Sequence, residues 1–263
     1  MFNRLYNIYN KMIKYRKLTP KQMRNDDIYL VSYPRSGNTW ISFLIINVII
    51  LYLDLNIEVN FFNIHTFIPD IHVSRYIPER LQFPPFRRII KSHSPYNPFY
   101  KTIFLLVRDP GDVMVSYYYF MKNLGQYQND ISFFIRENKF GINAWINHSR
   151  SWLEKVEPSQ GISIFYYEKF RGDPMRELKR LFLLMGFNIN ENILNKAIEL
   201  SDFDYMKKLV EKTGRSYSIR KYKKFNFVRK GRVGSANEGL DKSDTLFIEK
   251  NAYKVMKKLN YYN

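Results

Sequence analysis

Apolar residues along the chain gather in runs of two lengths. The shorter runs are rich in β-branched and aromatic residues and have the length of buried strands. They lie near 28–32, 88–91, 102–107 and 162–166. The longer runs predict helices near 2–17, 39–53, 110–124, 129–155, 174–186, 190–198, 202–211 and 243–259. Strands that alternate with helix-length segments are typical of a parallel sheet.

This alternation predicts the fold class, an α/β fold with an open, mainly parallel sheet that helices flank on both faces. A chain of 263 residues with 45% hydrophobic residues can bury one sizeable core. Neither an internal repeat nor a low-complexity linker divides it. We therefore expect a single domain over 1–263, with residues 1–20 as an N-terminal helical extension. Ligands of such sheets bind beyond the carboxyl ends of the strands.

The segment 33–40, Tyr-Pro-Arg-Ser-Gly-Asn-Thr-Trp, lies between the first predicted strand and the first long apolar run. A strand, a tight loop and a helix N-terminus form an anion-binding geometry. Arg35 adds a permanent forked cation, and Gly37 lets backbone N–H groups approach an anion closely. The Walker A pattern is absent, which argues against an ordinary ATPase. The segment therefore predicts a P-loop-like loop that holds a phosphate or a sulfate.

Two later segments predict further anion contacts. Arg108 ends the strand 102–107, and Pro110 suits the first turn of a helix, so that Ser116 faces inward two turns later. Both side chains could reach one more phosphate. The segment 227–234 packs three cations and two glycines with little periodicity, and it is interpreted as a basic loop that closes over an anion.

These three segments, in this order, resemble the signatures of cytosolic-type sulfotransferases. Those enzymes carry Tyr-Pro-Lys-Ser-Gly-Thr-Thr-Trp, Arg-x-Pro-x-Asp-x-x-x-Ser and Arg-Lys-Gly-x-x-Gly, and they use 3′-phosphoadenosine-5′-phosphosulfate (PAPS) as donor. Lys91-Ser92-His93-Ser94-Pro95 resembles their Lys-Thr-His-x-Pro. The resemblance spans 33–234, and it implies a PAPS-dependent sulfotransferase whose product is adenosine 3′,5′-bisphosphate (PAP) and which needs no metal.

The resemblance also implies roles for individual residues. His93, which follows a short apolar run, would be the general base, Lys91 would orient the transferring sulfuryl group, and Arg35, at a position where the family has lysine, would neutralise the leaving phosphate. The donor-binding set would be Arg35, Ser36, Gly37, Asn38, Thr39, Trp40, Arg108, Ser116, Tyr167, Ser201, Arg229, Lys230 and Gly231. Within it, 36–39 would cradle the 5′-phosphosulfate, and Arg108, Ser116 and 229–231 would hold the 3′-phosphate. Trp40 and Tyr167 would contact the adenine. The other three histidines, His65, His72 and His148, are interpreted as structural or surface residues.

A net charge of +18 suggests a polyanion partner, and a non-catalytic polyanion or nucleic-acid binding protein stays open as an alternative class. The cations are dispersed, however, and no nucleic-acid recognition motif accompanies them. We therefore expect no specific nucleic-acid partner. A kinase would need Mg²⁺-holding carboxylates near the loop, which the pattern does not offer. The chain has no cysteine, which excludes disulfides and thiolate chemistry.

The acceptor is expected to be a small molecule whose pocket is lined by 60–85, 125–140 and 213–225. Transfer to a hydroxyl is the first expectation, and N-sulfation of an amine, a guanidine or a carbamoyl nitrogen stays open. The most apolar stretch, 41–53, is too short to span a bilayer, and 1–18 lacks the apolar core of a signal peptide, so we expect a cytoplasmic protein. Homodimerisation is left open, because 235–238 departs from the Asp-Trp-Lys-Asn that is common in the family.

Overall fold

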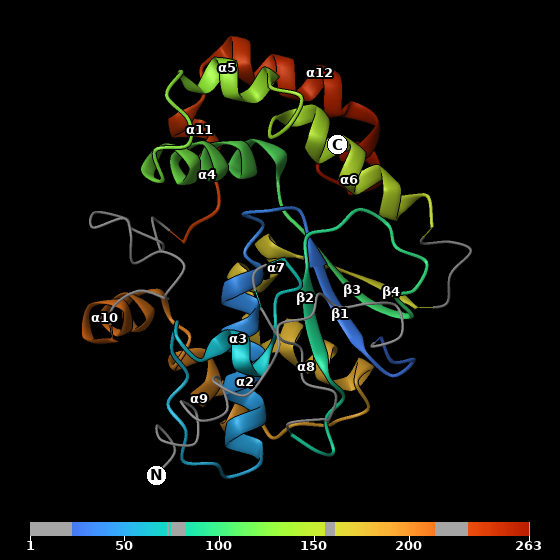
Figure 1. The fold of residues 1–263 in the computed structure, drawn as a ribbon, viewed down its shortest axis with the longest axis vertical. Coiled ribbons are helices and arrows are strands. Elements are labelled where there is room, and N and C mark those ends of the chain that lie inside the picture. The colour runs from blue at the N-terminus through green and yellow to red at the C-terminus, as the bar shows by residue number, and fades with distance from the viewer. Residues whose placement is uncertain (1–22, 73, 75–82, 156–160, 214–230, 263) are drawn as a thin grey trace.

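Four parallel strands form the centre of the molecule. The computed structural model describes residues 23–72, 74, 83–155, 161–213 and 231–262 (Figure 1). Its strands are β1 (Ile28–Ser32), β2 (Ile89–Ser92), β3 (Thr102–Val107) and β4 (Ile162–Tyr166). They pair in the order β2-β1-β3-β4, with Ile28 opposite both Ile89 and Thr102. The predicted fold class is confirmed, and each predicted strand lies within one residue of its observed bounds.

The helices largely follow the predicted pattern. They are α2 (Asn38–Tyr52), α3 (Ile64–Phe67), α4 (Pro110–Asn123), α5 (Ile131–Arg136), α6 (Ile142–Leu153), α7 (Tyr167–Gly172), α8 (Pro174–Leu184), α9 (Glu191–Glu199), α10 (Phe203–Thr213), α11 (Ala236–Gly239) and α12 (Lys242–Lys258). The sequence patterns did not predict α3, α7 or α11, because helices of four to six residues are too short to show a period. The helix expected near 2–17, and with it the extension 1–20, lies outside the described residues.

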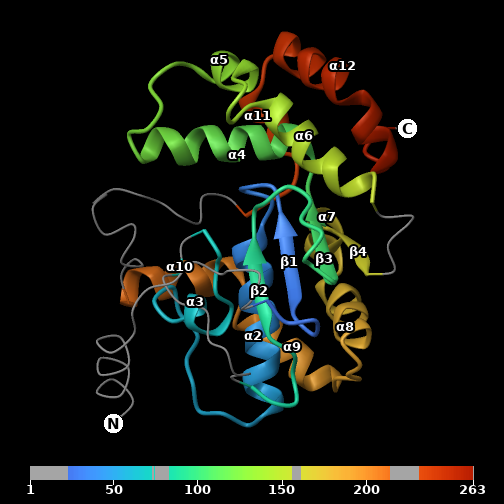
Figure 2. The ribbon, with the colours of Figure 1, turned by 45° about the vertical axis from the view of Figure 1, so that its right-hand side comes forward.

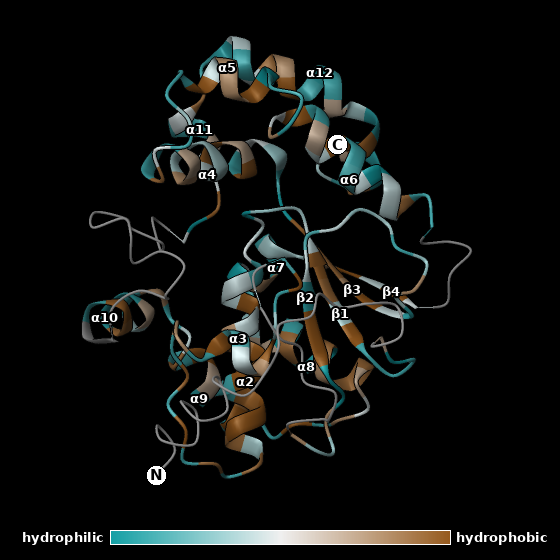
Figure 3. Ribbon diagram, viewed as in Figure 1, coloured by the Kyte–Doolittle hydropathy of each residue, from teal (hydrophilic) through white to brown (hydrophobic). Residues whose placement is uncertain are grey.

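The sheet is buried on both faces. Alternate side chains of β1 enter two separate hydrophobic cores, with Ile28 and Leu30 in one and Tyr29 and Val31 in the other. The first core is completed by α2, which is apolar nearly all round and appears as a brown helix in Figure 3. The second core lies among α4, α5, α6 and α12. Burial on both faces explains why the strands are continuous apolar runs without polar alternation.

Helices α4, α5, α6, α11 and α12 lie together at one end of the molecule, toward which the arrowhead of β1 points (Figures 1 and 2). The start of α4 follows from its sequence, because the Asp109 side chain accepts a hydrogen bond from Asp112 N at 2.9 Å and Pro110 occupies the first turn. The carboxyl ends of β1, β2 and β3 therefore meet the base of this helical layer. Within the described residues, no helix has both the length and the apolar character needed to cross a membrane.

Candidate active site at the carboxyl ends of the strands

The loop between β1 and α2 has the backbone of an anion cradle. Arg35 and Gly37 both have positive φ, at 71° and 95°, so the chain turns sharply before the helix begins. A Cβ on Gly37 would lie 2.4 Å from the Tyr167 ring, and only glycine fits there. No side chain of the described residues caps α2, and its first turn contains no acidic residue. The helix N-terminus is therefore available to an anion.

Two arginine side chains contact this loop or extend from it. Arg35 Nε donates to Ser116 Oγ at 3.3 Å, and the Arg35 guanidinium lies 4.6 Å from the centre of the Phe120 ring. Arg108 Nη1 donates to Arg35 O at 3.3 Å, and the Arg108 guanidinium covers the Tyr167 ring at 4.3 Å. Arg108 Nε is buried and has no hydrogen-bond partner among the described residues. The structure thus brings Arg35, Arg108 and Ser116 together, with one buried donor unsatisfied.

The side chains expected at the adenine end also lie together. Trp40 Nε1 donates to Ser201 O at 2.9 Å, and the Trp40 ring makes an edge contact with Tyr167 at 5.7 Å. Ser201 Oγ accepts a hydrogen bond from Asn47, so this hydroxyl already has a partner within the fold.

Of the three residues 229–231 that were expected at the 3′-phosphate, the structure describes Gly231. It has a φ of 57°, and a Cβ there would lie 2.5 Å from the Phe203 ring. Arg229 and Lys230, which were expected to hold the 3′-phosphate, lie outside the described residues.

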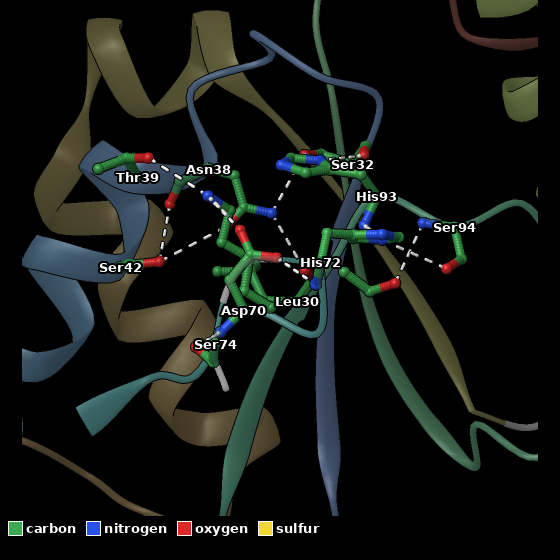
Figure 4. Close-up of polar contacts among 12 residues, drawn as sticks. Leu30, Ser32, Asn38, Thr39, Ser42, Asp70, His72, Ser74, His93 and Ser94 are labelled. Atoms are coloured by element: carbon green, nitrogen blue, oxygen red, sulfur yellow. Dashed lines mark hydrogen bonds and ion pairs between the residues drawn. The ribbon is translucent and has the colours of Figure 1, made fainter. Parts of the chain in front are cut away.

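Asn38 differs from its expected role in the cradle. Its side-chain amide donates to Leu30 O and to Ser32 Oγ, both at 3.0 Å, and the residue is buried (Figure 4). The side chain therefore turns away from the loop and toward the carboxyl end of β1. Only the backbone N–H of Asn38 remains to contribute to an anion cradle. Ser36, another member of the expected cradle, is also buried, at 1% exposure.

The His93 imidazole is held by a hydrogen bond just after β2. Its Nδ1 lies 2.8 Å from Ser32 O, a contact that requires the proton on Nδ1 and leaves the lone pair on Nε2. Burial, together with the nearby Lys91 ammonium, lowers the pKa of the His93 imidazole well below its ordinary value. The neutral form, which can accept a proton, is then the one present at neutral pH. This geometry suits the general-base role that the sequence predicted.

The Lys91 ammonium is held by a residue that the sequence did not single out. It forms an ion pair with Asp70 at 3.1 Å and donates to Thr39 Oγ1 at 3.4 Å. Asp70 reaches this position because 69–71 lies along the edge of β2, where Lys91 N donates to Pro69 O and Ile71 N donates to Lys91 O. Asp70 belongs to the stretch expected to line the acceptor pocket, and no local motif marks it.

Asp112 also organises the site, and it was given no role in advance although the matched pattern contains it. Its carboxylate accepts from Arg108 Nη2 at 3.1 Å, from Gly234 N at 3.0 Å and from Ala236 N at 2.8 Å. Arg108 Nη2 also donates to Arg232 O at 3.0 Å. The end of the third predicted signature and the residues just after it are therefore tied to the start of α4.

Of the histidines interpreted as structural or surface residues, His72 contacts His93, and His148 lies near His72. His72 Nε2 accepts a hydrogen bond from His93 N at 3.1 Å, and the two rings stack at 6.0 Å (Figure 4). His148 is buried against Tyr33, and its Nε2 has no partner among the described residues. Burial lowers the pKa of His148 to about 4. Sequence spacing could not have found this grouping, because the rings come from three distant segments.

The site can bind an anion and accept a proton. Arg35, Arg108, Lys91 and the α2 N-terminus supply the positive potential, and His93 supplies a neutral imidazole at its edge. Within the described residues, no group of three or more histidine or carboxylate side chains is placed to hold a metal ion.

Comparison with known proteins identifies the family. A sulfotransferase domain model matches residues 25–260. Sulfotransferase 1B1 of the dog (Canis lupus familiaris) is 31% identical over 232 residues, which cover 80% of this chain and 77% of that protein. Sulfotransferase 1B1 of the mouse (Mus musculus) is 28% identical over 250 residues, which cover 86% and 81%.

Solved structures share the fold. Retinol dehydratase in complex with androsterone and the inactive cofactor PAP superposes with a TM-score of 0.67 at 20% identity, over 95% of this chain and 83% of that one. Mouse sulfotransferase SULT7A1 complexed with PAP superposes with a TM-score of 0.65 at 21% identity, over 89% and 84%. The chain therefore belongs to the sulfotransferase domain family and is an enzyme of the transferase class.

Proposed function

We propose that this enzyme transfers a sulfuryl group from PAPS to a hydroxyl of a small-molecule acceptor. The observation that carries the proposal is the position of the Lys91 ammonium at the first turn of α2 and beside His93, whose Nε2 lone pair is left for a proton, with Arg35 and Arg108 at the loop before α2. A donor with separated anionic groups fits this charge distribution. The PAP complexes of the structural neighbours support the same donor.

The two ends of the donor would be held by different parts of the site. The loop 35–39 would hold the 5′-phosphosulfate through backbone N–H groups at the start of α2. Arg108 and Ser116 would hold the 3′-phosphate, since the buried Arg108 Nε lacks a partner among the described residues and an anion would satisfy it. We extend the same role to Arg229 and Lys230 from the family pattern alone.

His93 would carry the proton transfer. The acceptor oxygen attacks sulfur in line with the departing phosphate oxygen, so an O–S bond forms as the S–O bond to the phosphate breaks. The acceptor proton goes to His93 Nε2, and PAP leaves with the bonding electron pair. Ser32 O holds the opposite ring nitrogen throughout. Arg35 would stabilise the negative charge that builds on the leaving oxygen, and Lys91 would orient the transferring sulfuryl group.

A small alcohol is the acceptor class that the comparisons favour. Retinol dehydratase has been solved with androsterone and with retinol, which are small apolar alcohols. In this chain, aromatic side chains near the loop could line such a pocket, because Tyr33 makes edge contacts with Tyr117 and with His148. We also propose a cytoplasmic location, which the patterns at 1–18 and 41–53 led us to expect.

The test is an acceptor screen with PAPS that reads sulfated products by mass, with alcohols, phenols and amines in separate groups. We expect sulfated alcohols or phenols. His93→Ala should abolish transfer and keep the affinity for PAP. Arg108→Ala should weaken PAP binding at least tenfold, whereas Arg150→Ala, on the exposed face of α6, should leave it unchanged. Near-normal turnover by His93→Ala would contradict the proposed base.

A further inference from the structure

Asp70 is a buried carboxylate at the centre of the site. The residue is 2% exposed, and its Oδ2 lies 3.1 Å from Lys91 Nζ. Its Oδ1 accepts a hydrogen bond from His72 N at 2.9 Å, and its backbone N–H donates to Ser74 Oγ at 2.8 Å (Figure 4). Asp70 is thus fixed by its own backbone and by the turn that follows it, independently of any ligand.

The position of Lys91 explains why a carboxylate belongs there. Its ammonium lies 3.4 Å from Thr39 Oγ1 in the first turn of α2, at the positive end of the helix dipole. A buried cation at that point is unfavourable unless an anion balances it. Among the described residues, Asp70 is the anion that contacts it. The imidazoles of His65 and His93 also face this pair, and His72 faces His93.

From this geometry we infer that Asp70 is a positioning residue, which holds the Lys91 ammonium against the start of α2 and balances its charge until the anionic donor binds. The inference rests on the proposed function, because it takes Lys91 to be the cation at the transferring group. The donor then brings a second anion to an ammonium that is already placed. Asp70 and the donor compete for the same cation. The carboxylate therefore lowers the affinity for the donor, but it keeps the Lys91 ammonium in a defined position.

The first experiment measures PAP binding by calorimetry. Asp70→Asn keeps the shape and an oxygen acceptor and removes only the negative charge, so we expect PAP to bind about tenfold more tightly, because repulsion is lost. The matched control is Asp27→Asn, which removes a carboxylate from a buried ion pair with Arg88 at the other end of the sheet. It should lower stability without changing PAP affinity. Unchanged or weaker PAP binding by folded Asp70→Asn would overturn the inference.

A second pair of variants stays informative even if Asp70→Asn does not fold. Lys91→Gln leaves Asp70 as an unpaired buried anion beside the donor site, and it should weaken PAP binding at least tenfold. Adding Asp70→Asn removes both charges, and the double variant should regain most of that loss. A double variant that binds no better than Lys91→Gln would reject the positioning role. Failure of the unaltered enzyme to bind PAP would instead reject the proposed function, and the inference with it.

Discussion

Replacing Asp112 with alanine should release the segment 231–239 from the start of α4. The carboxylate is 1% exposed and accepts hydrogen bonds from Arg108 and from the backbone N–H groups of Gly234 and Ala236. Hydrogen bonds to a charged group contribute about 1.5–3 kcal/mol each, and breaking a buried ion pair costs about 3–5 kcal/mol. Because the three contacts share one carboxylate, their contributions do not add fully.

We therefore expect Asp112→Ala to lower the free energy of unfolding by about 4 kcal/mol, measured by urea denaturation. For a chain of this length that loss corresponds to a drop of about 8–16 °C in Tm. Amide hydrogen exchange gives a local assay, because the N–H groups of Gly234 and Ala236 should lose protection beyond the global effect.

The control is Asp244→Ala. Asp244 is also a 1% exposed carboxylate, and it pairs with Arg136 and accepts from Ser132, on the side of the helical layer formed by α5 and α12. Asp244→Ala should lower the free energy of unfolding by a comparable amount. In this variant the backbone amides of Gly234 and Ala236 should exchange hydrogen only as fast as global unfolding allows. If the two amides stayed protected in Asp112→Ala, or if stability fell by less than about 1 kcal/mol, the reasoning about this anchor would be wrong.

Two further predictions concern the loop and the buried histidine. Gly37→Ala would place a Cβ 2.4 Å from the Tyr167 ring at a residue whose φ of 95° is left-handed. We therefore expect the free energy of unfolding, measured by urea denaturation, to fall by about 2–4 kcal/mol. PAP binding, measured by calorimetry, should be at least tenfold weaker. Gly172→Ala, where a Cβ meets nothing within 4 Å, is the matched control, and equal behaviour of the two variants would refute the argument. Burial lowers the pKa of His148 to about 4, whereas the pKa of an unfolded histidine is near 6.5. Between these two pH values the unfolded chain binds more protons than the folded protein. The free energy of unfolding should therefore fall as the pH drops from about 6.5 to about 4. His148→Gln should flatten this dependence by up to about 1.4 kcal/mol per pH unit, and an unchanged slope of urea stability against pH would show that His148 does not contribute.

Much of the fold could be predicted from sequence because its strands are short apolar runs with sharp ends. The run 28–32 ends at the Pro/Ser/Gly turn of the first loop, and Asp109 with Pro110 marks the first turn of α4. These signals are local, so one sequence contains them. The sequence pattern predicted one helical region over 129–155 and did not show the five-residue gap at 137–141 that separates α5 from α6, because apolar residues continue on both sides of it.

The parts of the site that sequence reasoning missed depend on tertiary placement. Asp70 contacts Lys91 only because 69–71 lies along the edge of β2. No sequence pattern between the two residues predicts this ion pair. The side-chain direction of Asn38 is a similar case. A family threonine at that position suggested a contact in the loop, but the longer amide reaches Leu30 O and Ser32 Oγ in β1.

The contacts of Arg108 have a consequence for biosynthesis. Its guanidinium is fixed by Asp112 and by Arg232 O, and the two backbone groups that share Asp112 belong to Gly234 and Ala236, 122 and 124 residues beyond Asp112. A ribosome therefore has to add about 124 residues after Arg108 before this cation acquires its final surroundings. A nascent chain that stops short of 232 lacks this part of the proposed donor site.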